Sequence, residues 1–594
     1  MTVEAIRKGG GFLLEETDPS EVFIPEDFDD EQRMFAKTAE DFVHNEVLAN
    51  LARTEAKEEG LMAELLRKAG ELGLLMIDIP EKYGGLELDK VTSMLVSEVI
   101  SKGGAFATTY GGHCGIGSMP IVFFGTEEQK QKYLPRLATG EIISCYALTE
   151  AGSGSDALAA RAKAELSEDG KHYVLNGEKT FISNGGFADL FIVFAKIDGE
   201  KFSCFIVEKD FGGLSIGAEE KKMGIKGSST VQVYLDNCKV PVENLLGEIG
   251  RGHKIAFNIL NMGRFKLGAG CVGAAKIAFD DAVKYANERH QFGRAISSFG
   301  MIKNKIADMA TAIYMSEAMA YRTGGLLDRV LEPIDKSADD APARIMAGIE
   351  EYVTECSIMK IKGSEMVDSV VDEVVQIHGG YGFIEDYPAE RHYRDARVAR
   401  IYEGTNEINR MLVPGMLLKR ALKGDLPLLA AAKRLQDELL EVPSFGADEE
   451  DEILAAERKM IANARKVSLL TLGLAAQKFG DKLSDEQGVL GDLADVIIET
   501  YAMESAYLRT MKILDARGED GARTAIDMTR LYINGAMGRI DLWTRELLAA
   551  CAEGDELRTL LAAARRLTRY TPADSLHLRL SVADAFIEKE AYEI

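Results

Sequence analysis

The chain has 594 residues, which is too long for one hydrophobic core, so we expect several packed domains. It is 46% hydrophobic and 28% charged, a composition typical of a folded globular protein and not of a disordered one. The formal net charge of −26 argues against nucleic acid or an anionic membrane as the main partner, although backbone N–H groups and a few arginines could still hold a phosphate-bearing cofactor.

A helical N-terminal domain is predicted over residues 1–141. Apolar side chains between Glu31 and Val47 recur at three- and four-residue intervals, as one face of a helix requires. Similar patterns cover Leu61–Leu74 and Lys90–Lys102. The small-residue segment ATTYGGHCGIGSMP then leads to a region that we expect to be a short helical hairpin.

Short segments rich in β-branched and aromatic residues predict a central β-barrel or β-sandwich over residues 142–247. The candidate strands contain KHYVLNG, LFIVFAKI, KFSCFIVEK and VQVYLDNCKVP. Turn-forming dipeptides begin at Asn176, Asp198 and Asp236, and we expect them to separate the strands.

Helical periodicity returns near Gly250 and continues to the end of the chain. A four-helix bundle is predicted over residues 248–422, with long helices over Phe299–Leu331, Ala343–Gln376 and Ile408–Leu422. Residues 423–594 are predicted to form an additional helical tail domain, entered through the acidic loop VPSFGADEEDE. The predicted fold class is therefore α+β multidomain and mostly α, in the order N-terminal helical domain, β-domain, four-helix bundle and helical tail.

The seven cysteines form a scattered set without a CxxC pair, which argues against a disulfide framework or a zinc site and favours a reducing compartment. The N-terminal segment MTVEAIRKGGGFLLEETDPSE lacks an apolar core long enough for a signal peptide. No uncharged apolar run is long enough to span a bilayer. We therefore expect a cytoplasmic protein with no stable membrane insertion and no bound metal.

The first of four unusual segments is YALTEAGSGSD, at the entrance to the β-domain. Gly152 and Gly154 let backbone amides approach a planar or phosphorylated ligand, and Thr149 and Ser155 offer hydroxyls. Taken alone, an ordinary turn before a strand explains these residues at least as well.

The second and third segments are KTFISNGG and ERHQFGR. Phe181 could stack on an aromatic ring system with Ser183 beside it, although a buried strand aromatic is the simpler interpretation. Arg289 lies near a predicted helix C-terminus, where the helix dipole alone favours a cation.

The fourth segment combines QIHGGYGF with the later IYEGTNE. Its glycines do not suit a helix interior and indicate a close approach of the backbone to a ligand. Glu403 follows in an apolar context, where burial would raise the pKa of its carboxyl toward the value that a general base near neutral pH needs. The alternative is a helix-start glutamate satisfied by a neighbouring amide, which Gly404 and Thr405 also permit.

Together and in this order, the four segments resemble the acyl-CoA dehydrogenase family over about Asp30 to Leu422. The helical tail and the segments EKKMGIKGSST, NILNMGRF and RDARVARIYEGTNEINR are most similar to its very-long-chain branch. The resemblance implies an FAD-dependent enzyme that converts long-chain acyl-CoA to trans-2-enoyl-CoA in fatty-acid β-oxidation and passes the electrons to electron-transfer flavoprotein.

The resemblance also places FAD between the β-domain and the bundle. The residues that it assigns to the flavin ring are Tyr146, Leu148, Thr149, Gly154, Ser155, Phe181, Ile182 and Ser183. The residues that it assigns to the adenosine-diphosphate half, across a subunit interface, are Arg289, Gln291 and Phe292 of one chain with Gln376, Gly379 and Gly380 of the other. Thr405 and Glu407 would close over the cofactor, and the shared site implies a homo-oligomer, with a homodimer expected.

The resemblance assigns the role of catalytic base to Glu403. Glu403 would take the α-proton while a hydride leaves the β-carbon for flavin N5, and the Glu403 backbone N–H with a ribityl hydroxyl of FAD would polarise the thioester carbonyl. Some branches carry the base at the position of Gly263, which cannot act as one here. The implied substrate contacts are Ser155, Asn261, Arg264, Tyr402, Gly404, Gly111 and Gly112, and an ordinary surface position is the alternative for the arginine.

Medium-chain relatives close the acyl cavity with polar side chains in the segment aligned with Thr108–Gly112. Gly111 and Gly112 predict a deeper cavity here and a chain of roughly twelve carbons or more, since each buried CH₂ adds ~0.8 kcal/mol, unless other side chains refill the space. Ala151 and Phe181 replace a proline and a tryptophan common in the flavin motifs, and phenylalanine can still stack.

Two other functions use the same scaffold. An acyl-CoA oxidase would pass the electrons to O₂, and a scaffold or assembly protein would use the tail as a binding surface. In mitochondrial long-chain relatives the tail helps to hold the enzyme on a membrane. Anionic lipid would repel the acidic loop from Asp448 to Glu452, so we expect the tail to pack at the dimer interface instead.

Overall fold

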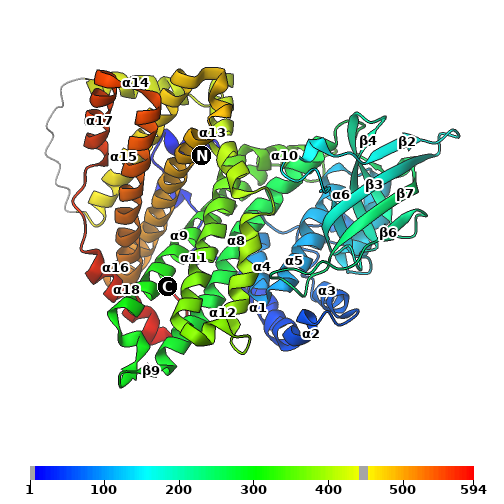
Figure 1. The fold of residues 1–594 in the computed structure, drawn as a ribbon, viewed down its shortest axis with the longest axis horizontal. Coiled ribbons are helices and arrows are strands. Elements are labelled where there is room, and N and C mark those ends of the chain that lie inside the picture. Colours follow the sequence, from blue (N-terminus) through cyan, green and yellow to red (C-terminus); the bar gives the residue numbers. More distant parts are fainter. Residues whose placement is uncertain (1–6, 441–451) are drawn as a thin grey trace.

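The computed structural model describes residues 7–440 and 452–594. A helical N-terminal part, a β-sheet and a long helical C-terminal part follow one another along the chain (Figure 1). The sheet lies at one end of the molecule, the last helices lie at the other, and a bundle of long helices separates them. The predicted fold class is confirmed.

The N-terminal part packs around one buried helix, α4 (Lys90–Ile100), which is covered on every face. Asp89 caps this helix by accepting a hydrogen bond from the Thr92 N–H at 2.7 Å. Helix α5 (Ala105–Gly111) runs directly into a single π-helical turn, Gly112–Gly117. The other helices of this part are α1 (Asp30–Phe42), α2 (Leu51–Glu55), α3 (Leu61–Glu71), α6 (Met119–Phe124) and α7 (Glu127–Ala138).

The β-domain is one eight-stranded sheet in the order β6-β7-β3-β2-β4-β5-β8, with β1 paired to β4 in parallel. Strand β4 (Leu190–Ile197) is buried on both faces, because Phe191 packs in the core of the sheet and Ile192 packs toward the helices. The remaining strands are β1 (Ser144–Ala147), β2 (Lys163–Leu166), β3 (His172–Ser183), β5 (Lys201–Glu208), β6 (Leu214–Ile216), β7 (Thr230–Pro241) and β8 (Leu245–Leu246).

The bundle is built on two long helices, α8 (Gly252–Glu288) and α11 (Val353–His378). They approach closely at a pair of glycines, since a Cβ added at Gly363 would lie 3.1 Å from the Gly268 carbonyl oxygen. The other helices of the bundle are α9 (Gly300–Leu331), α10 (Ala341–Glu351), α12 (Pro388–Ala396) and α13 (Asn406–Lys423).

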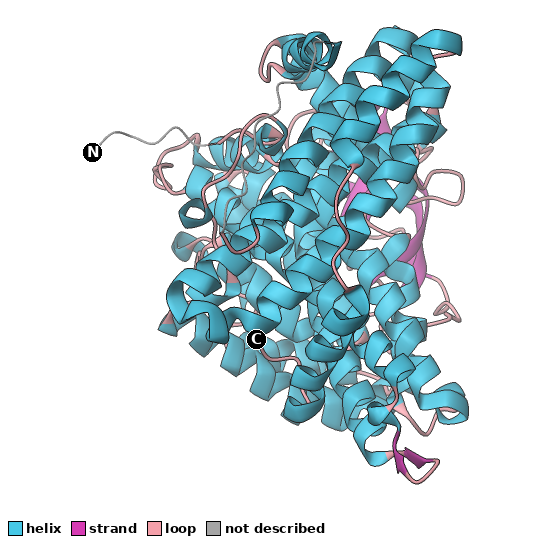
Figure 2. Ribbon diagram, turned by 90° about the vertical axis from the view of Figure 1, so that its left-hand side faces the viewer, coloured by secondary structure: helices cyan, strands magenta, loops and turns pink. Residues whose placement is uncertain are grey.

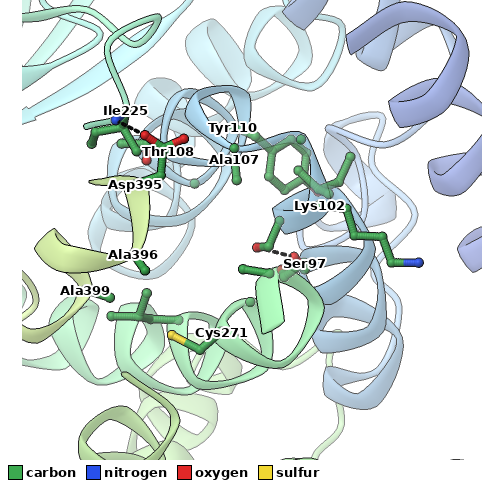
Figure 3. Close-up of a pocket in the computed structure, with 18 of the residues that line it drawn as sticks. Ser97, Lys102, Ala107, Thr108, Tyr110, Ile225, Cys271, Asp395, Ala396 and Ala399 are labelled. Atoms are coloured by element: carbon green, nitrogen blue, oxygen red, sulfur yellow. Dashed lines mark hydrogen bonds between the residues drawn. The ribbon is translucent and has the colours of Figure 1, made fainter. Parts of the chain in front are cut away.

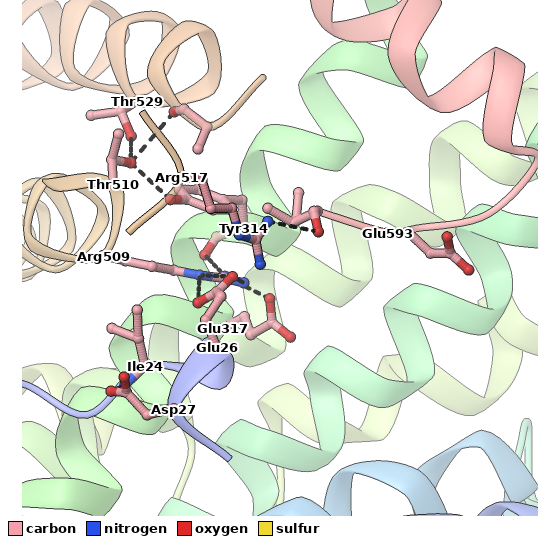
Figure 4. A network of polar contacts seen from close by, with 12 residues as sticks. Ile24, Glu26, Asp27, Tyr314, Glu317, Arg509, Thr510, Arg517, Thr529 and Glu593 are labelled. Atoms are coloured by element: carbon pink, nitrogen blue, oxygen red, sulfur yellow. Dashed lines mark hydrogen bonds and ion pairs between the residues drawn. The ribbon is translucent and has the colours of Figure 1, made fainter. Parts of the chain in front are cut away.

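The tail packs along the bundle, where the helices lie side by side (Figures 1 and 2). Its helices are α14 (Leu428–Leu440), α15 (Ala455–Phe479), α16 (Gln487–Cys551), α17 (Gly554–Thr568) and α18 (Ser575–Lys589). Arg509 of α16 pairs with Glu317 of α9 at 2.6 Å and with Glu26 of the N-terminal segment at 2.8 Å (Figure 4). These buried ion pairs join three distant parts of the sequence.

Within the described ranges, no helix is both long enough and apolar enough to cross a membrane. Residues 448–451 of the acidic loop lie outside those ranges, so the expected repulsion from anionic lipid stays a prediction.

Candidate active site

A cavity lies where α5, α8 and the segment after α12 meet (Figure 3). Tyr110 of α5 and Cys271 of α8 lie on different sides of it. Asp395 at the end of α12 accepts a hydrogen bond from the Ile225 N–H, which ties a loop of the β-domain to the bundle. The lining includes six residues singled out from the sequence: Gly111, Gly112, Ser183, Gly263, Tyr402 and Glu403.

Glu403 lies in a tight turn before α13. Its φ of +58° is left-handed, a conformation that costs a non-glycine residue about 1–3 kcal/mol and that often marks a functional site. Gly404 continues the turn at φ +77°. Thr405 then caps α13, because its hydroxyl accepts a hydrogen bond from the Ile408 N–H at 3.3 Å. The cap fixes the turn that directs the Glu403 side chain into the cavity.

One oxygen of the Glu403 carboxyl group is shielded from solvent. Its Oε2 atom is buried and has no hydrogen-bond partner in the described chain. Burial raises its pKa to about 7, while the charges of Arg264 and Lys360 act in the opposite direction. A Cβ added at Gly263 would lie 2.4 Å from Oε2, so the carboxylate occupies space that any side chain at that position would fill.

Arg264 is buried and not an ordinary surface arginine, with only 5% of the residue exposed. Its Nε donates to the Glu403 carbonyl oxygen at 3.2 Å, and its Nη1 donates to Asn261 Oδ1 at 2.8 Å. Two predicted substrate residues therefore support the turn that carries the predicted base.

The two segments assigned to the flavin ring lie side by side. The Thr180 N–H donates to the Thr149 carbonyl at 2.9 Å. The buried ammonium of Lys179 donates to the Leu148 carbonyl at 3.1 Å and to Glu150 at 2.7 Å. This arrangement brings the first two sequence motifs together at the face of the β-domain nearest the bundle.

Phe181 is the most distinctive residue of this pair of segments. It is 65% exposed and has a left-handed φ of +57°, at a register irregularity of β3. Gly154 and Ser155 are exposed as well. Tyr146 and Ile182, in contrast, are buried, and the Tyr146 ring packs 5.1 Å from that of Phe194. The strained backbone at this exposed aromatic side chain favours a functional contact there.

A second cluster lies at the far tip of the bundle, at the hairpin of β9 (His290–Gln291) and β10 (Arg294–Ala295) (Figure 1). Phe292 is 94% exposed there, with φ +54°. The Arg289 guanidinium lies 5.4 Å from the centre of the Tyr381 ring. This contact brings the hairpin against the segment that holds Gly379 and Gly380 of the same chain, whereas the resemblance assigns these two segments to different chains. Gln376, near the end of α11, is exposed. Glu407 is also exposed but lies in the first turn of α13, next to the turn that carries Glu403. The bundle separates this cluster from the sheet within one chain.

Two residues that the sequence did not single out also contact the turn. Asn409 Nδ2 donates to the Gly404 carbonyl at 2.8 Å and to the Thr405 carbonyl at 3.1 Å. Lys360 Nζ donates to the same Gly404 carbonyl at 2.8 Å. In the sequence, Lys360 appears only as a lysine in the middle of an apolar helix pattern. Such a pattern does not show which residue the lysine contacts.

Models of the acyl-CoA dehydrogenase family match four parts of the chain. The N-terminal domain matches residues 29–141 and the middle domain matches residues 145–238. Two C-terminal domain models match residues 250–417 and 463–566. The second of these lies in the predicted tail.

The chain is similar along its length to a "Probable acyl-CoA dehydrogenase" of Bacillus subtilis (strain 168), with 50% identity over 593 residues and 99% of both chains covered. It is also similar to an acyl-CoA dehydrogenase of Bacillus anthracis whose crystal structure is complexed with FAD. That match has 51% identity, a TM-score of 0.97 and coverage of 99% and 100%. The rat mitochondrial very long-chain specific acyl-CoA dehydrogenase is 42% identical over 365 residues, 60% of this chain and 53% of the rat protein.

Proposed function

Because the chain belongs to the acyl-CoA dehydrogenase family, we propose that Glu403 is the base of an FAD-dependent dehydrogenation of long-chain acyl-CoA. The single observation that carries the proposal is the Glu403 carboxylate, whose buried Oε2 lies against Gly263 in the cavity without a hydrogen-bond partner in the described chain. A carboxyl group whose pKa is about 7 is ionised in about half of the molecules at neutral pH, and its carboxylate form is basic enough to accept a proton.

Each residue of the site would have its own role in the reaction. Glu403 would remove the α-proton of the thioester, and its backbone N–H would donate to the thioester carbonyl as negative charge develops there. Arg264 and Asn261 would hold the turn from the side of α8. FAD, when bound, supplies the acceptor for the hydride that leaves the β-carbon.

The residues present fit FAD. Phe181 offers an exposed ring face beside the Gly/Ser segment, and Ser183 lines the same cavity as Glu403. Arg289 and Phe292 offer a cation and an exposed ring for the adenosine-diphosphate half. Because the bundle separates these two clusters in one chain, we infer that a second copy completes each site, in a homodimer or a higher homo-oligomer.

Two finer parts of the proposal are a preference for long acyl chains and electron-transfer flavoprotein as the electron acceptor. A Cβ added at Gly111 meets no atom within 4 Å, so open space adjoins the helix there. A Cβ added at Gly112 would lie 3.0 Å from Asn184 Nδ2, so another side chain occupies the space beside the second glycine. The similarity to a very long-chain specific enzyme supports the same preference. Electron-transfer flavoprotein is proposed as the acceptor because the family resemblance implies it.

The test begins with the visible spectrum of the purified protein under anaerobic conditions. Palmitoyl-CoA is expected to bleach the flavin band of the wild-type protein and to leave that of Glu403→Gln unchanged. Reoxidation by electron-transfer flavoprotein should be much faster than by O₂. No flavin band after reconstitution with FAD would contradict the enzymatic function, and fast reoxidation by O₂ would indicate an oxidase.

A further inference from the structure

The carbonyl groups of the turn that carries Glu403 all face donors on neighbouring helices. Arg264 of α8 holds the carbonyl of residue 403 at 3.2 Å. Asn409 of α13 holds the carbonyls of residues 404 and 405 at 2.8 and 3.1 Å. Lys360 of α11 holds the carbonyl of Gly404 at 2.8 Å. With its carbonyls fixed on one side, the turn has little freedom to redirect the Glu403 side chain.

Lys360 differs from the other donors because it is a fully buried ammonium whose bonded partners are neutral. It is 0% exposed, and its second bond goes to Asn406 Oδ1 at 2.7 Å. The amide nitrogen of Asn406 donates in turn to Ser364 Oγ and Glu365 Oε1, each at 3.0 Å. Burying an ammonium that contacts no carboxylate costs free energy, so we expect an opposite charge close to Lys360.

The groups that act on Lys360 come from three elements packed around it. Cys271 and Arg264 belong to α8, Glu403 belongs to the turn, and Glu407 belongs to α13. Burial lowers the pKa of Lys360 to about 8, and the Glu403 carboxylate acts against this shift. The groups that act electrostatically with Glu403 are Arg264, Lys360, Tyr146 and Tyr402.

We propose that Lys360 is a positioning residue for the reaction: its ammonium anchors the Gly404 carbonyl and keeps the Glu403 carboxylate ionised and in place against Gly263. The inference rests on the proposed role of Glu403 as the base. Lysine suits the position, because a compact ammonium can donate to two carbonyl-type oxygens at 2.7 and 2.8 Å.

The sign of the expected pH effect follows from the charge. The Lys360 cation favours the ionised form of Glu403 and therefore lowers the pKa of that carboxyl. Removing the cation would raise the Glu403 pKa above its value of about 7. Because only the deprotonated base can take the α-proton, the rise of the reaction rate with pH would then occur at higher pH.

The experiment measures the single-turnover rate at which palmitoyl-CoA reduces the bound FAD, between about pH 5.5 and pH 9. The acid limb of the pH profile is the range in which the rate rises with pH. In Lys360→Met its midpoint is expected to move to a pH about one unit higher. The maximal rate should fall by about tenfold or more, because the turn is less well fixed. Lys360→Gln keeps a donor but no charge, so it should show the same shift with a smaller fall. Lys360→Arg should keep the wild-type acid limb.

Lys362→Met is the matched control. Lys362 lies on the same helix but faces the tail, where it pairs with Glu499 of α16 at 2.6 Å. The control is expected to lower the unfolding temperature and to leave the acid limb unchanged. FAD content and unfolding temperature are measured for every variant, so that a loss of structure is distinguished from a change in the base.

The outcomes separate the inference from the proposed function. If Lys360→Met and Lys360→Gln both keep the wild-type acid limb and Glu403→Gln is inactive, the inference about Lys360 is overturned. The proposed role of Glu403 would then still stand. Rapid FAD reduction by Glu403→Gln would instead overturn Glu403 as the base. If Lys360→Met does not fold, the comparison of Lys360→Gln with Lys360→Arg decides the question, because an equal shift in both would contradict a role for the charge.

Discussion

The Glu403 carboxylate packs directly against Gly263, where there is no side chain. The proposed site therefore depends on two features, a carboxylate in one element and the absence of a side chain in another. The two residues are 140 positions apart in the sequence, and only the packing of the turn against α8 joins them. The added Cβ would lie 2.4 Å from Oε2, which is closer than any normal contact.

Gly263→Ala should therefore displace the carboxylate without unfolding the protein, because the end of a glutamate side chain can move. We expect the rate of FAD reduction by palmitoyl-CoA to fall by about tenfold to a hundredfold, since reacting groups tolerate little misplacement. FAD content should stay at the wild-type level. Gly415→Ala on α13, where an added Cβ meets no atom within 4 Å, is the control and should keep the wild-type rate. Equal rates in both variants would contradict the steric argument.

Gly111 allows the chain-length preference to be tested in the same way. An added Cβ there meets no atom within 4 Å, so Gly111→Leu should fill cavity space and not clash with the protein. Each CH₂ of substrate that loses its place costs about 0.8 kcal/mol. We expect kcat/KM to fall strongly for palmitoyl-CoA and little for butyryl-CoA, measured with one electron acceptor. A parallel fall for both substrates would argue against an acyl pocket beside this residue.

Some residues of the proposed site could be singled out from the sequence, and others could not. Glu403 could be singled out because it follows a segment of unusual composition, whereas Gly263 was singled out only through the family resemblance. Lys360 could not be singled out, because a lysine in a helix normally indicates a solvated face, and its two acceptors come from a turn some 45 residues later in the sequence. The burial of Arg264 depends in the same way on tertiary packing.

At the scale of elements, most helices and strands matched their predicted positions, and two exceptions can be traced to particular residues. The helix expected over Ala343–Gln376 is broken at Tyr352, whose buried hydroxyl donates to the Arg7 carbonyl at 2.6 Å. No glycine or proline marks this break. Asn176 and Asp236 begin dipeptides that we expected to be turns, but they lie inside β3 and β7, where the first adjoins a register irregularity.

The junction between the tail and the bundle leads to a prediction about stability. Arg509 of α16 is 2% exposed at its side chain and pairs with Glu26 and Glu317, so Arg509→Met would leave buried carboxylates with less compensation. The free energy of unfolding should fall by about 3–5 kcal/mol in urea titrations at pH 7. Arg558→Met removes the exposed pair with Asp555 and should cause no measurable change. A small effect of Arg509→Met would mean that the tail is held mainly by apolar packing.

At the scale of the whole molecule, the two clusters proposed to hold FAD are far apart in one chain, because one lies at the β-domain and the other at the β9 hairpin at the tip of the bundle (Figure 1). One contains Phe181 and adjoins Glu403, and the other contains Arg289 and the exposed Phe292. If each site takes one cluster from each chain, a single polypeptide has two half-sites and no complete one. Oligomerisation would then be a condition for cofactor binding and not only a source of stability.

This arrangement predicts complementation between two inactive variants. Glu403→Gln removes the proposed base, and Arg289→Glu should prevent FAD binding by placing a negative charge beside the pyrophosphate. In a mixed dimer of the two, one site carries both substitutions and the other carries neither. Random pairing makes half of the dimers mixed, so co-expressed chains should recover about one quarter of the wild-type activity per site. Their FAD content should be about one half of the wild-type value, because Glu403→Gln chains still supply an unsubstituted Arg289.

Each variant expressed alone is the control and should be inactive, and separately tagged chains allow the mixed dimers to be purified. Light scattering on the same samples measures the oligomeric state. Purified mixed dimers should then reach about half of the wild-type activity, since one of their two sites is intact. Inactive mixed dimers would place both clusters in the site of a single chain, because each chain would then carry one disabling substitution in its own site.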